Sequence, residues 1–471
     1  SQLDSENNTV IIIFGMTKSF RRRLFYFLFL IFLITGTGLV VYSRGWRVDL
    51  ANFTIQKTGG IYILTKPKEV DVQIEAENKS VENKPGILRN GILIDGLLPK
   101  TYKIIIKKDG YLPWQKQVEV NPELVTELKQ IILIPQNLKF QPVLAQTAVA
   151  KDFWPLSGNQ IVFQDDKGGL YYLDYLQNKS QKLKGTKFIA GDNYGKKIIT
   201  YDNSSKNFYL NDSSDPKSVL NINLIFKNIW DRETDKSFSK VKIGDIFIHS
   251  YKADNIFLST NQGLYIIDTK QSELIEITDK NLSGEAYIFD LSNFYFADQE
   301  SLWVYNLILK SKNLLVEMPN VAKLAISNSH KYLAFLQENG DFYLIPSFEL
   351  GGKPQKISGG VKEFSFSPDS NKIAFWNQKG NLNLYFPEEY YYYGGFKKEK
   401  GDDVNLAKFS DLRKMIWYSD SGHLTVQDER GIYFIEIDDR PPINKYFLAD
   451  EVQNFSYDFS GEFLLLKDGA F

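Results

Sequence analysis

The sequence predicts a mainly β protein that combines one N-terminal transmembrane helix, a small β-sandwich and a C-terminal β-propeller. Three observations predict this architecture: an uncharged run near the N-terminus, a stretch of short strands punctuated by turn residues, and a repeat over the remaining two thirds of the chain. The composition agrees, because 14% of the 471 residues are aromatic and flat side chains pack well on pleated sheets. The chain is also too long for one compact core.

The N-terminal region predicts a membrane anchor. Residues 1–23 form a basic cytoplasmic leader, and residues 24–43 form the span, with no charge from Leu24 to Tyr42. A helix of about 19 residues is about 28 Å long, close to the hydrocarbon thickness of a bilayer. The run lacks a small-residue cleavage site, which favours an uncleaved signal anchor. The Arg22-Arg23 pair also resembles a twin-arginine export signal, an alternative that the very apolar segment behind it disfavours.

Basic residues around the span set the expected orientation. Four Lys or Arg side chains precede the helix, whereas Arg44 and Arg47 follow it. The excess on the N-terminal side predicts a cytoplasmic N-terminus and an extracytoplasmic remainder. The expected location is therefore the cell membrane, crossed once. Residues 1–15 precede Met16, and the sequence leaves open whether they are translated.

Residues 59–135 predict the small β-sandwich, with strands separated by Pro, Gly and Asn clusters. The expected strands are Ile61–Leu64, Val70–Glu75, Thr101–Ile106 and Gln117–Val120, in an antiparallel arrangement. The region carries Gly59-Gly60-Ile61-Tyr62-Ile63, then Ile94-x-Gly96-Leu97-Leu98-Pro99-x-x-Tyr102, and then Lys107-Lys108-Asp109-Gly110-Tyr111 with Trp114. These motifs resemble the PEGA domain family, although Glu69-Val70 replace its name-giving Gly-Ala. The resemblance implies a spacer or adhesion-like module of a bacterial or archaeal envelope, without catalytic residues.

Residues 138–471 predict the propeller. The stretch from Phe364 to Phe386 alternates apolar and polar residues between breakers, and the same pattern occurs 40 residues earlier. A unit this small cannot bury a core alone, so copies must pack on one another. We expect about eight four-stranded blades, with seven as the alternative. Their central strands are expected near Val162, Ile199, Phe257, Tyr295, Ala334, Ala374, Thr425 and Leu464.

Two long gaps and the chain ends complete the expected propeller. Residues 211–240 and 390–403 are expected to be loops inserted between blades. The Ser367-Pro368-Asp369 turn resembles the TolB-like and WD-type repeats of bacterial propellers, a likeness of fold rather than function. The last repeat is too short for four strands, so Leu138–Leu144 are expected to add its outer strand and close the ring.

No catalytic, cofactor or metal site is expected from the sequence. The chain has no Cys, and His249, His330 and His423 are spread over three repeats, where they are expected to be solvated turn residues. Five Trp residues of the repeats are expected to pack within or between blades. The unusual Tyr-rich stretch offers a candidate partner-binding rim, comprising Tyr390, Tyr391, Tyr392, Tyr393 and Phe396. An aromatic outer strand with a glycine turn is the structural alternative.

These observations favour a membrane-anchored binding or scaffold protein outside the cytoplasm. The expected partner is an envelope protein or a cell-wall glycan, because exposed Tyr side chains suit both. A net charge of −1 gives no field that would attract nucleic acid, so no nucleic-acid partner is expected. The alternatives are a hydrolase or lyase with its site at the channel mouth, and an envelope sensor. We expect no enzyme activity, because the predicted innermost strands carry mainly aliphatic, aromatic and Ser residues.

Overall fold

The computed structural model describes residues 17–49, 52–75, 79–82, 91–143, 149–249, 252, 254–280, 282, 286–290, 292–391, 397–458 and 461–467. The chain divides into two compact units. The smaller unit comprises residues 1–107, 117–132 and 392–396, and the larger comprises residues 108–116, 133–391 and 397–471. The predicted domain bounds, 59–135 and 138–471, stay predictions.

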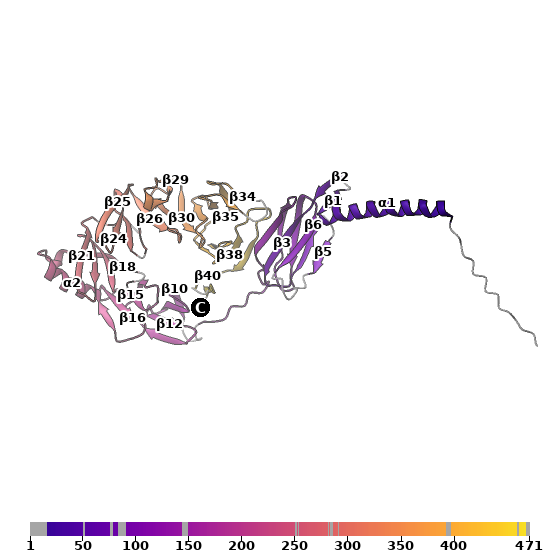
Figure 1. Ribbon diagram of the computed structural model, residues 1–471. Coiled ribbons are helices and arrows are strands. Elements are labelled where there is room, and N and C mark those ends of the chain that lie inside the picture. The colour runs from indigo at the N-terminus through magenta and orange to yellow at the C-terminus, as the bar shows by residue number, and fades with distance from the viewer. Residues whose placement is uncertain are drawn as a thin grey trace, which may run out of the picture. The chain divides into compact units, whose positions relative to one another are not determined.

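Helix α1 (Lys18–Ser43) begins the described part of the smaller unit (Figure 1). The Thr17 side chain caps its N-terminus by accepting from the Phe20 N–H. At its C-terminal end, Arg47 Nη1 donates to the Tyr42 carbonyl over 2.8 Å, which places a cation at the negative end of the helix dipole. None of its residues is buried, and the helix is long and apolar enough to cross a membrane. It contains the predicted span, residues 24–43.

The remainder of the smaller unit is β structure, as predicted. The strands are β1 (Trp46–Asp49), β2 (Thr54–Lys57), β3 (Gly59–Lys66), β4 (Asp71–Ile74), β5 (Lys79–Glu82), β6 (Ile92–Leu97), β7 (Lys100–Lys107), β8 (Trp114–Val120) and β9 (Val125–Ile132). They form a β1-β2 hairpin and two sheets with orders β6-β3-β9 and β5-β4-β7-β8. The β3–β9 pair is parallel, so the expectation of a purely antiparallel sandwich was wrong. The reason is that β9 follows β8 across to the other sheet instead of forming a hairpin with it.

The larger unit contains eight consecutive sheets, and each is a blade of sequentially paired strands. Blades 1 to 4 are β10 (Ala150–Pro155), β11 (Gln160–Asp165), β12 (Leu170–Asp174), β13 (Lys179–Lys182); β14 (Lys187–Gly191), β15 (Lys197–Asp202), β16 (Asn207–Asp212), β17 (Val219–Asn221); β18 (Ile243–Ile248), β19 (Asn255–Thr260), β20 (Gly263–Asp268), β21 (Glu273–Thr278); and β22 (Tyr287–Phe289), β23 (Asn293–Ala297), β24 (Ser301–Asn306), β25 (Ser311–Glu317).

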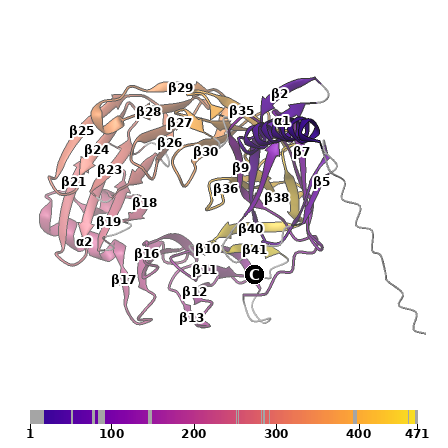
Figure 2. The same ribbon diagram turned by 45° about the vertical axis from the view of Figure 1, so that its right-hand side comes forward.

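Blades 5 to 8 continue the series. They are β26 (Val321–Ile326), β27 (Tyr332–Gln337), β28 (Phe342–Pro346), β29 (Gln355–Ser358); β30 (Val361–Phe366), β31 (Ile373–Asn377), β32 (Asn381–Tyr385), β35 (Asp403–Lys408); β36 (Lys414–Trp417), β37 (His423–Asp428), β38 (Gly431–Glu436), β39 (Lys445–Ala449); and β40 (Val452–Tyr457), β41 (Phe463–Lys467). Figure 2 shows first strands such as β18 and β26 on the inner side of this arrangement and fourth strands such as β21 and β25 on its outer side.

The prediction of a propeller is confirmed, and the repeat was read in the correct register. All eight residues predicted to centre a strand lie in the second strand of their blade. Seven blades have four described strands and the eighth has two. The alternative of seven blades therefore does not apply to the described sheets.

Packing between blades closes the ring. Every neighbouring pair of blades shares a cluster of buried apolar side chains. The first and last blades share one too, in which Leu464 and Leu466 of β41 pack with Phe153 and Phe163. Asn454 Nδ2 also donates to Asp152 Oδ1 over 2.7 Å, which joins β40 to β10. Ring closure thus rests on buried apolar surface supported by hydrogen bonds.

The predicted means of closure is not what the structure shows. Residues 138–143 form no strand, and Leu144 lies outside the described residues. Among the described strands, β40 pairs with β41 and neither pairs with this segment. Val143 instead packs beside the cluster shared by the first and last blades. Pro142 has no backbone N–H that could donate to a neighbouring strand. The segment therefore contacts the first and last blades through the Val143 side chain and not through strand pairing.

Both predicted insertions exist, but each differs from the expected loop. The first contains helix α2 (Ile222–Glu233) and the 3₁₀ turn η2 (Phe238–Lys240) between blades 2 and 3. The second forms a hairpin of β33 (Tyr390–Tyr391) and β34 (Lys397–Lys398). This hairpin lies inside blade 6, between its third and fourth strands, rather than between blades. A further 3₁₀ turn, η3 (Phe348–Leu350), lies in blade 5.

One turn position is reused to join blades 5 to 7. His330, Ser370 and Ser421 all adopt positive φ in the turn between the first and second strands of their blades. Ser370 Oγ accepts from the Ser329 N–H, and Ser421 Oγ accepts from the Asp369 N–H, each over 3.0 Å. Each of these serines therefore bonds the equivalent turn of the preceding blade. The repeated contact fixes the spacing between successive turns.

Candidate functional site

A pocket of about 610 Å³ lies between blades 2 and 3 of the larger unit. Its volume falls in the range of about 300–1,000 Å³ that is usual for ligand pockets. The lining comes from β14, β15 and β16 of blade 2, from the start of α2, and from β18 of blade 3. The lining residues are Lys187, Ile189, Tyr201, Lys206, Phe208, Asn223, Lys242, Ile243, Gly244, Asp245 and Ile246.

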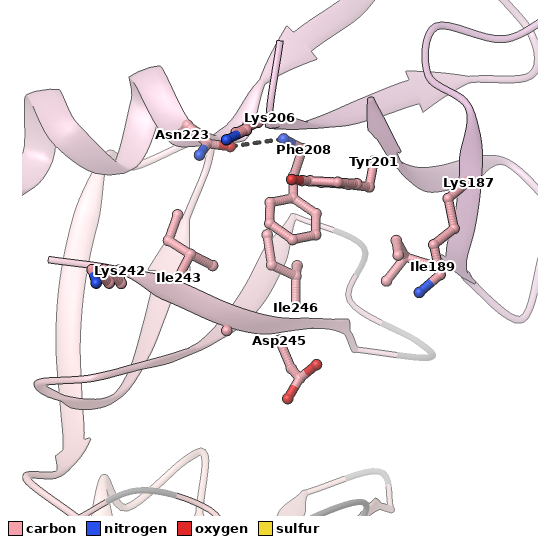
Figure 3. Close-up of a pocket in the computed structure, with 11 residues that line it drawn as sticks. Lys187, Ile189, Tyr201, Lys206, Phe208, Asn223, Lys242, Ile243, Asp245 and Ile246 are labelled. Carbon is pink, nitrogen blue, oxygen red and sulfur yellow. Dashed lines mark hydrogen bonds between the residues drawn. The ribbon is translucent and has the colours of Figure 1, made fainter. Parts of the chain in front are cut away.

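Helix α2 builds one wall of this pocket. The Asn221 side chain caps the helix by accepting from the Leu224 N–H over 3.1 Å. Two residues later, Asn223 Oδ1 accepts from the backbone N–H of Phe208 over 2.7 Å, which ties the helix to β16 (Figure 3). Phe226 and Trp230 follow Asn223 at i+3 and i+7 on the same side of the helix, and both are buried in the cluster shared by blades 2 and 3.

The floor of the pocket is apolar and its rim is cationic. The rings of Tyr201 and Phe208 lie 4.7 Å apart, with Ile189, Ile243 and Ile246 around them. Figure 3 shows Lys187 on one side of these rings and Lys242 on the other. Lys187, Lys206 and Lys242 are all exposed, and Asp245 is the carboxylate among the lining residues. The arrangement suits a ligand that carries both an apolar group and negative charge.

Beside the pocket, the first strands of blades 2 and 3 carry apolar residues at a position where several other blades carry polar ones. Six of the eight described first strands contain a β-bulge, so the bulge belongs to the fold. After the bulge, Lys323 pairs with Glu363 between blades 5 and 6, and Asn454 bonds Asp152 between blades 8 and 1. The equivalent residues of blades 2 and 3 are Ala190 and Ile246. An apolar interface therefore replaces a polar one beside the pocket.

The structure describes part of the Tyr-rich rim. Tyr390 is half-buried: its ring lies 5.7 Å from that of Phe386, and the Lys372 ammonium lies 4.2 Å above it. Tyr391 is 64% exposed. Tyr392, Tyr393 and Phe396 lie outside the described residues. Tyr390 therefore packs against its blade and Tyr391 is exposed, and the partner-binding rim stays a prediction.

The histidines correct one expectation from the sequence. His249 and His423 are buried rather than solvated. His249 Nδ1 accepts from the Lys252 N–H over 3.0 Å. His423 Nδ1 lies 2.7 Å from Asp420 Oδ2, and its ring stacks on that of Phe434. His249 lies against Phe289 of blade 4 and His423 against Phe434 of its own blade. Both were missed because a local pattern does not show whether a polar residue beside a turn points inward.

His330 is exposed but belongs to a cluster with Asp290 and Glu349. One potential ligand atom from each lies within 4.8 Å of the others, close enough for one divalent cation. Asp290 Oδ2, however, already accepts from the Tyr295 hydroxyl over 3.0 Å. His330 also occupies the turn position from which Ser370 and Ser421 reach the preceding blade. The cluster thus has an explanation as a contact between blades 4 and 5, and the expected absence of a metal site stays a prediction.

All five tryptophans of the repeats pack between blades, in agreement with the prediction that they pack within or between blades. Trp376 and Trp417 lie in the cluster of blades 6 and 7, and Trp230 in that of blades 2 and 3. Trp154 stacks on Phe188 with ring centroids 5.1 Å apart, across blades 1 and 2. Trp303 packs beside the cluster of blades 3 and 4. These side chains therefore stabilise the packing of one blade on the next.

Comparisons with known proteins concern the fold alone. No protein-family model and no curated protein matches the sequence. PorZ, a bacterial surface component of the type-IX secretion system of Porphyromonas gingivalis, is 13% identical with a TM-score of 0.38, and the match covers 66% of this chain and 39% of that one. BamB from Moraxella catarrhalis is 13% identical with a TM-score of 0.37, over 59% of this chain and 80% of that one.

A designed protein resembles this chain to a similar degree. The computationally designed Ika8 protein is 12% identical with a TM-score of 0.45, and the match covers 70% of this chain and 96% of that one. At these identities and TM-scores, the comparisons carry no argument about function. The predicted resemblance to the PEGA family is not confirmed.

Proposed function

We propose that this chain is a membrane-anchored binding or scaffold protein whose propeller faces away from the cytoplasm. The observation that carries the proposal is α1, an apolar helix of 26 residues with none buried. Such a surface is costly in water and is stabilised in a bilayer. The basic residues before the helix support a cytoplasmic N-terminus. The propeller then offers its exposed surfaces to a partner in the envelope.

The arrangement of the first strands supports binding rather than catalysis. Their polar side chains, such as Lys323 with Glu363 and Lys414 with Asn454, contact one another between blades. Groups held this way stabilise the ring and are less available to a substrate. We therefore propose that the chain has no enzyme activity. The partner would be an envelope protein or a glycan, and Tyr391 is the described residue of the proposed rim.

Cross-linking in cells tests this function. Tyr391 is replaced by the photo-cross-linking residue p-benzoylphenylalanine, and Leu350 is replaced likewise as a control, because Leu350 is 89% exposed but lies in a different blade. We expect a discrete adduct at position 391 after irradiation of membranes and little at position 350. Equal adduct at both positions, or none at position 391, would contradict the proposed rim.

A further inference from the structure

The pocket between blades 2 and 3 gives the proposed binding function a site and a ligand chemistry. We propose that it binds an acidic peptide segment of a protein partner. An apolar side chain of the peptide would lie on the Tyr201 and Phe208 rings, and flanking carboxylates would meet the lysines of the rim. The inference rests on the proposed function and deepens it.

Uncompensated positive charge points to an anionic ligand. Among the described residues, Lys187, Lys206 and Lys242 form no ion pair. By contrast, three lysines of blades 3 and 4 are paired with acids: Lys270 with Asp254, Lys280 with Glu300 and Lys310 with Glu273. Three cations around one concavity, against the single carboxylate of Asp245, raise the local concentration of anions.

The floor selects against a sugar and in favour of an apolar side chain. Sugars need many hydrogen-bonding partners, but the neutral polar side chains of the lining are Asn223 and Tyr201. Asn223 Oδ1 is already engaged by the Phe208 N–H. Three isoleucines and the Phe208 ring offer apolar contact instead, so burial of an aliphatic or aromatic side chain supplies the affinity.

The interface of blades 2 and 3 differs from those of blades 5 and 6, 7 and 8, and 8 and 1, where polar side chains link the first strands. Ala190 and Ile246 follow the bulges where other blades carry linking polar groups. Helix α2, inserted at the same interface, adds the wall with Asn223. The apolar floor of the blade strands and the wall added by α2 therefore occur together at this interface.

Peptide binding to the full chain in detergent micelles tests the inference. The probe is a fluorescein-labelled peptide of alternating glutamate and phenylalanine, and its partner probe has glutamine in place of glutamate. We expect saturable binding of the acidic peptide that weakens as salt is raised, and at least tenfold weaker binding of the glutamine peptide. The triple variant Lys187→Gln, Lys206→Gln, Lys242→Gln should lose about tenfold in affinity, because three exposed ion pairs of modest strength are lost together.

A matched control variant distinguishes the effect of the pocket lysines from the effect of removing any three positive charges. Lys182→Gln, Lys217→Gln, Lys379→Gln removes three exposed lysines outside the pocket lining and should bind like the unmodified chain. All six lysines are exposed, so neither variant should change the melting temperature. Equal loss in both triple variants, or binding of the pocket variant within twofold of the unmodified chain, would overturn the inference.

A glycan probe distinguishes the other class of partner. Tighter binding of an oligogalacturonate than of the acidic peptide would overturn the choice of a peptide. The cross-linking experiment separates this inference from the proposed function. An adduct at position 391 together with unchanged peptide binding by the pocket variant would remove the pocket assignment and leave the binding function standing.

Discussion

Replacing Asp369 by Ala is expected to destabilise blade 6 by about 3 kcal/mol, because it leaves a buried ammonium without its carboxylate. Lys372 is fully buried, and its Nζ lies 2.7 Å from Asp369 Oδ2. Burial lowers the pKa of Lys372, although Asp369 opposes this shift. Removing one partner of a buried ion pair usually costs about 3–5 kcal/mol. We expect the lower end of that range because the Tyr390 ring remains over the Lys372 ammonium. The denaturant midpoint of the full chain measures the effect.

The double variant Asp369→Ala, Lys372→Met is the control for this prediction. It removes the unpaired Lys372 ammonium as well, and should recover part of the lost free energy of unfolding. Burial raises the pKa of Asp369, but Lys372 and the Ser367 hydroxyl lower it more, so it lies below the ordinary value. The contribution of the pair should therefore be present above about pH 4 and fade as the pH falls through the folded pKa. A cost below about 1 kcal/mol, or no relief in the double variant, would contradict the buried-pair account.

Replacing Trp230 by Ala is expected to cost about 3–5 kcal/mol, as for other buried aromatic side chains. Trp230 is 1% exposed, and its Nε1 donates to the Lys236 carbonyl over 2.8 Å. Its ring lies edge-on to Phe226 and to Tyr265 of blade 3. The substitution therefore opens a cavity between α2 and blade 3 and also leaves the Lys236 carbonyl without this donor.

Leu224→Ala is the matched control on the same helix, since Leu224 is 55% exposed. It should change the denaturant midpoint little, because exposed side chains bury little apolar surface. Hydrogen exchange should show Trp230→Ala weakening protection in β18–β21 before the distant blade 6. A cost similar to that of Leu224→Ala would show that α2 does not contribute to the core.

The repeat was predictable from the sequence because blades are local structures. Second strands such as those around Ala334 and Ala374 are buried on both faces and bounded by turn residues, and the spacing of the second strands persists along the chain. The strands of the smaller unit could be located in the same way. The parallel pairing of β3 with β9 could not, since a strand pattern does not say which sheet a strand joins.

Helix α2 was missed although its sequence carries a signal. Ile222, Phe226, Ile229 and Trp230 recur at helical spacing, and Asn221 precedes them as a cap. The polar residues between them made residues 211–240 look like a loop. A repeat of strands also biases the interpretation of an insertion toward a connecting loop.

The pocket could not be predicted because its residues become neighbours only when blades pack. Lys187 and Lys242 lie in different blades, and each alone looks like a solvated lysine. His423 was missed for another reason: it begins β37, where its ring stacks on Phe434 and its Nδ1 lies beside Asp420 of the preceding turn. The local pattern does not show whether such a polar side chain points inward or toward solvent.

Membrane topology tests the central claim most directly, and the absence of Cys makes the measurement simple. Lys18→Cys and Leu350→Cys each introduce a single thiol at an exposed position, one before the apolar span and one in the propeller. Spheroplasts are treated with a membrane-impermeant maleimide before and after permeabilisation. We predict that the thiol at position 350 reacts in intact spheroplasts and that the thiol at position 18 reacts only after permeabilisation. The reverse order, or a mature chain from which position 18 has been removed, would contradict an uncleaved anchor that holds the propeller outside the cytoplasm.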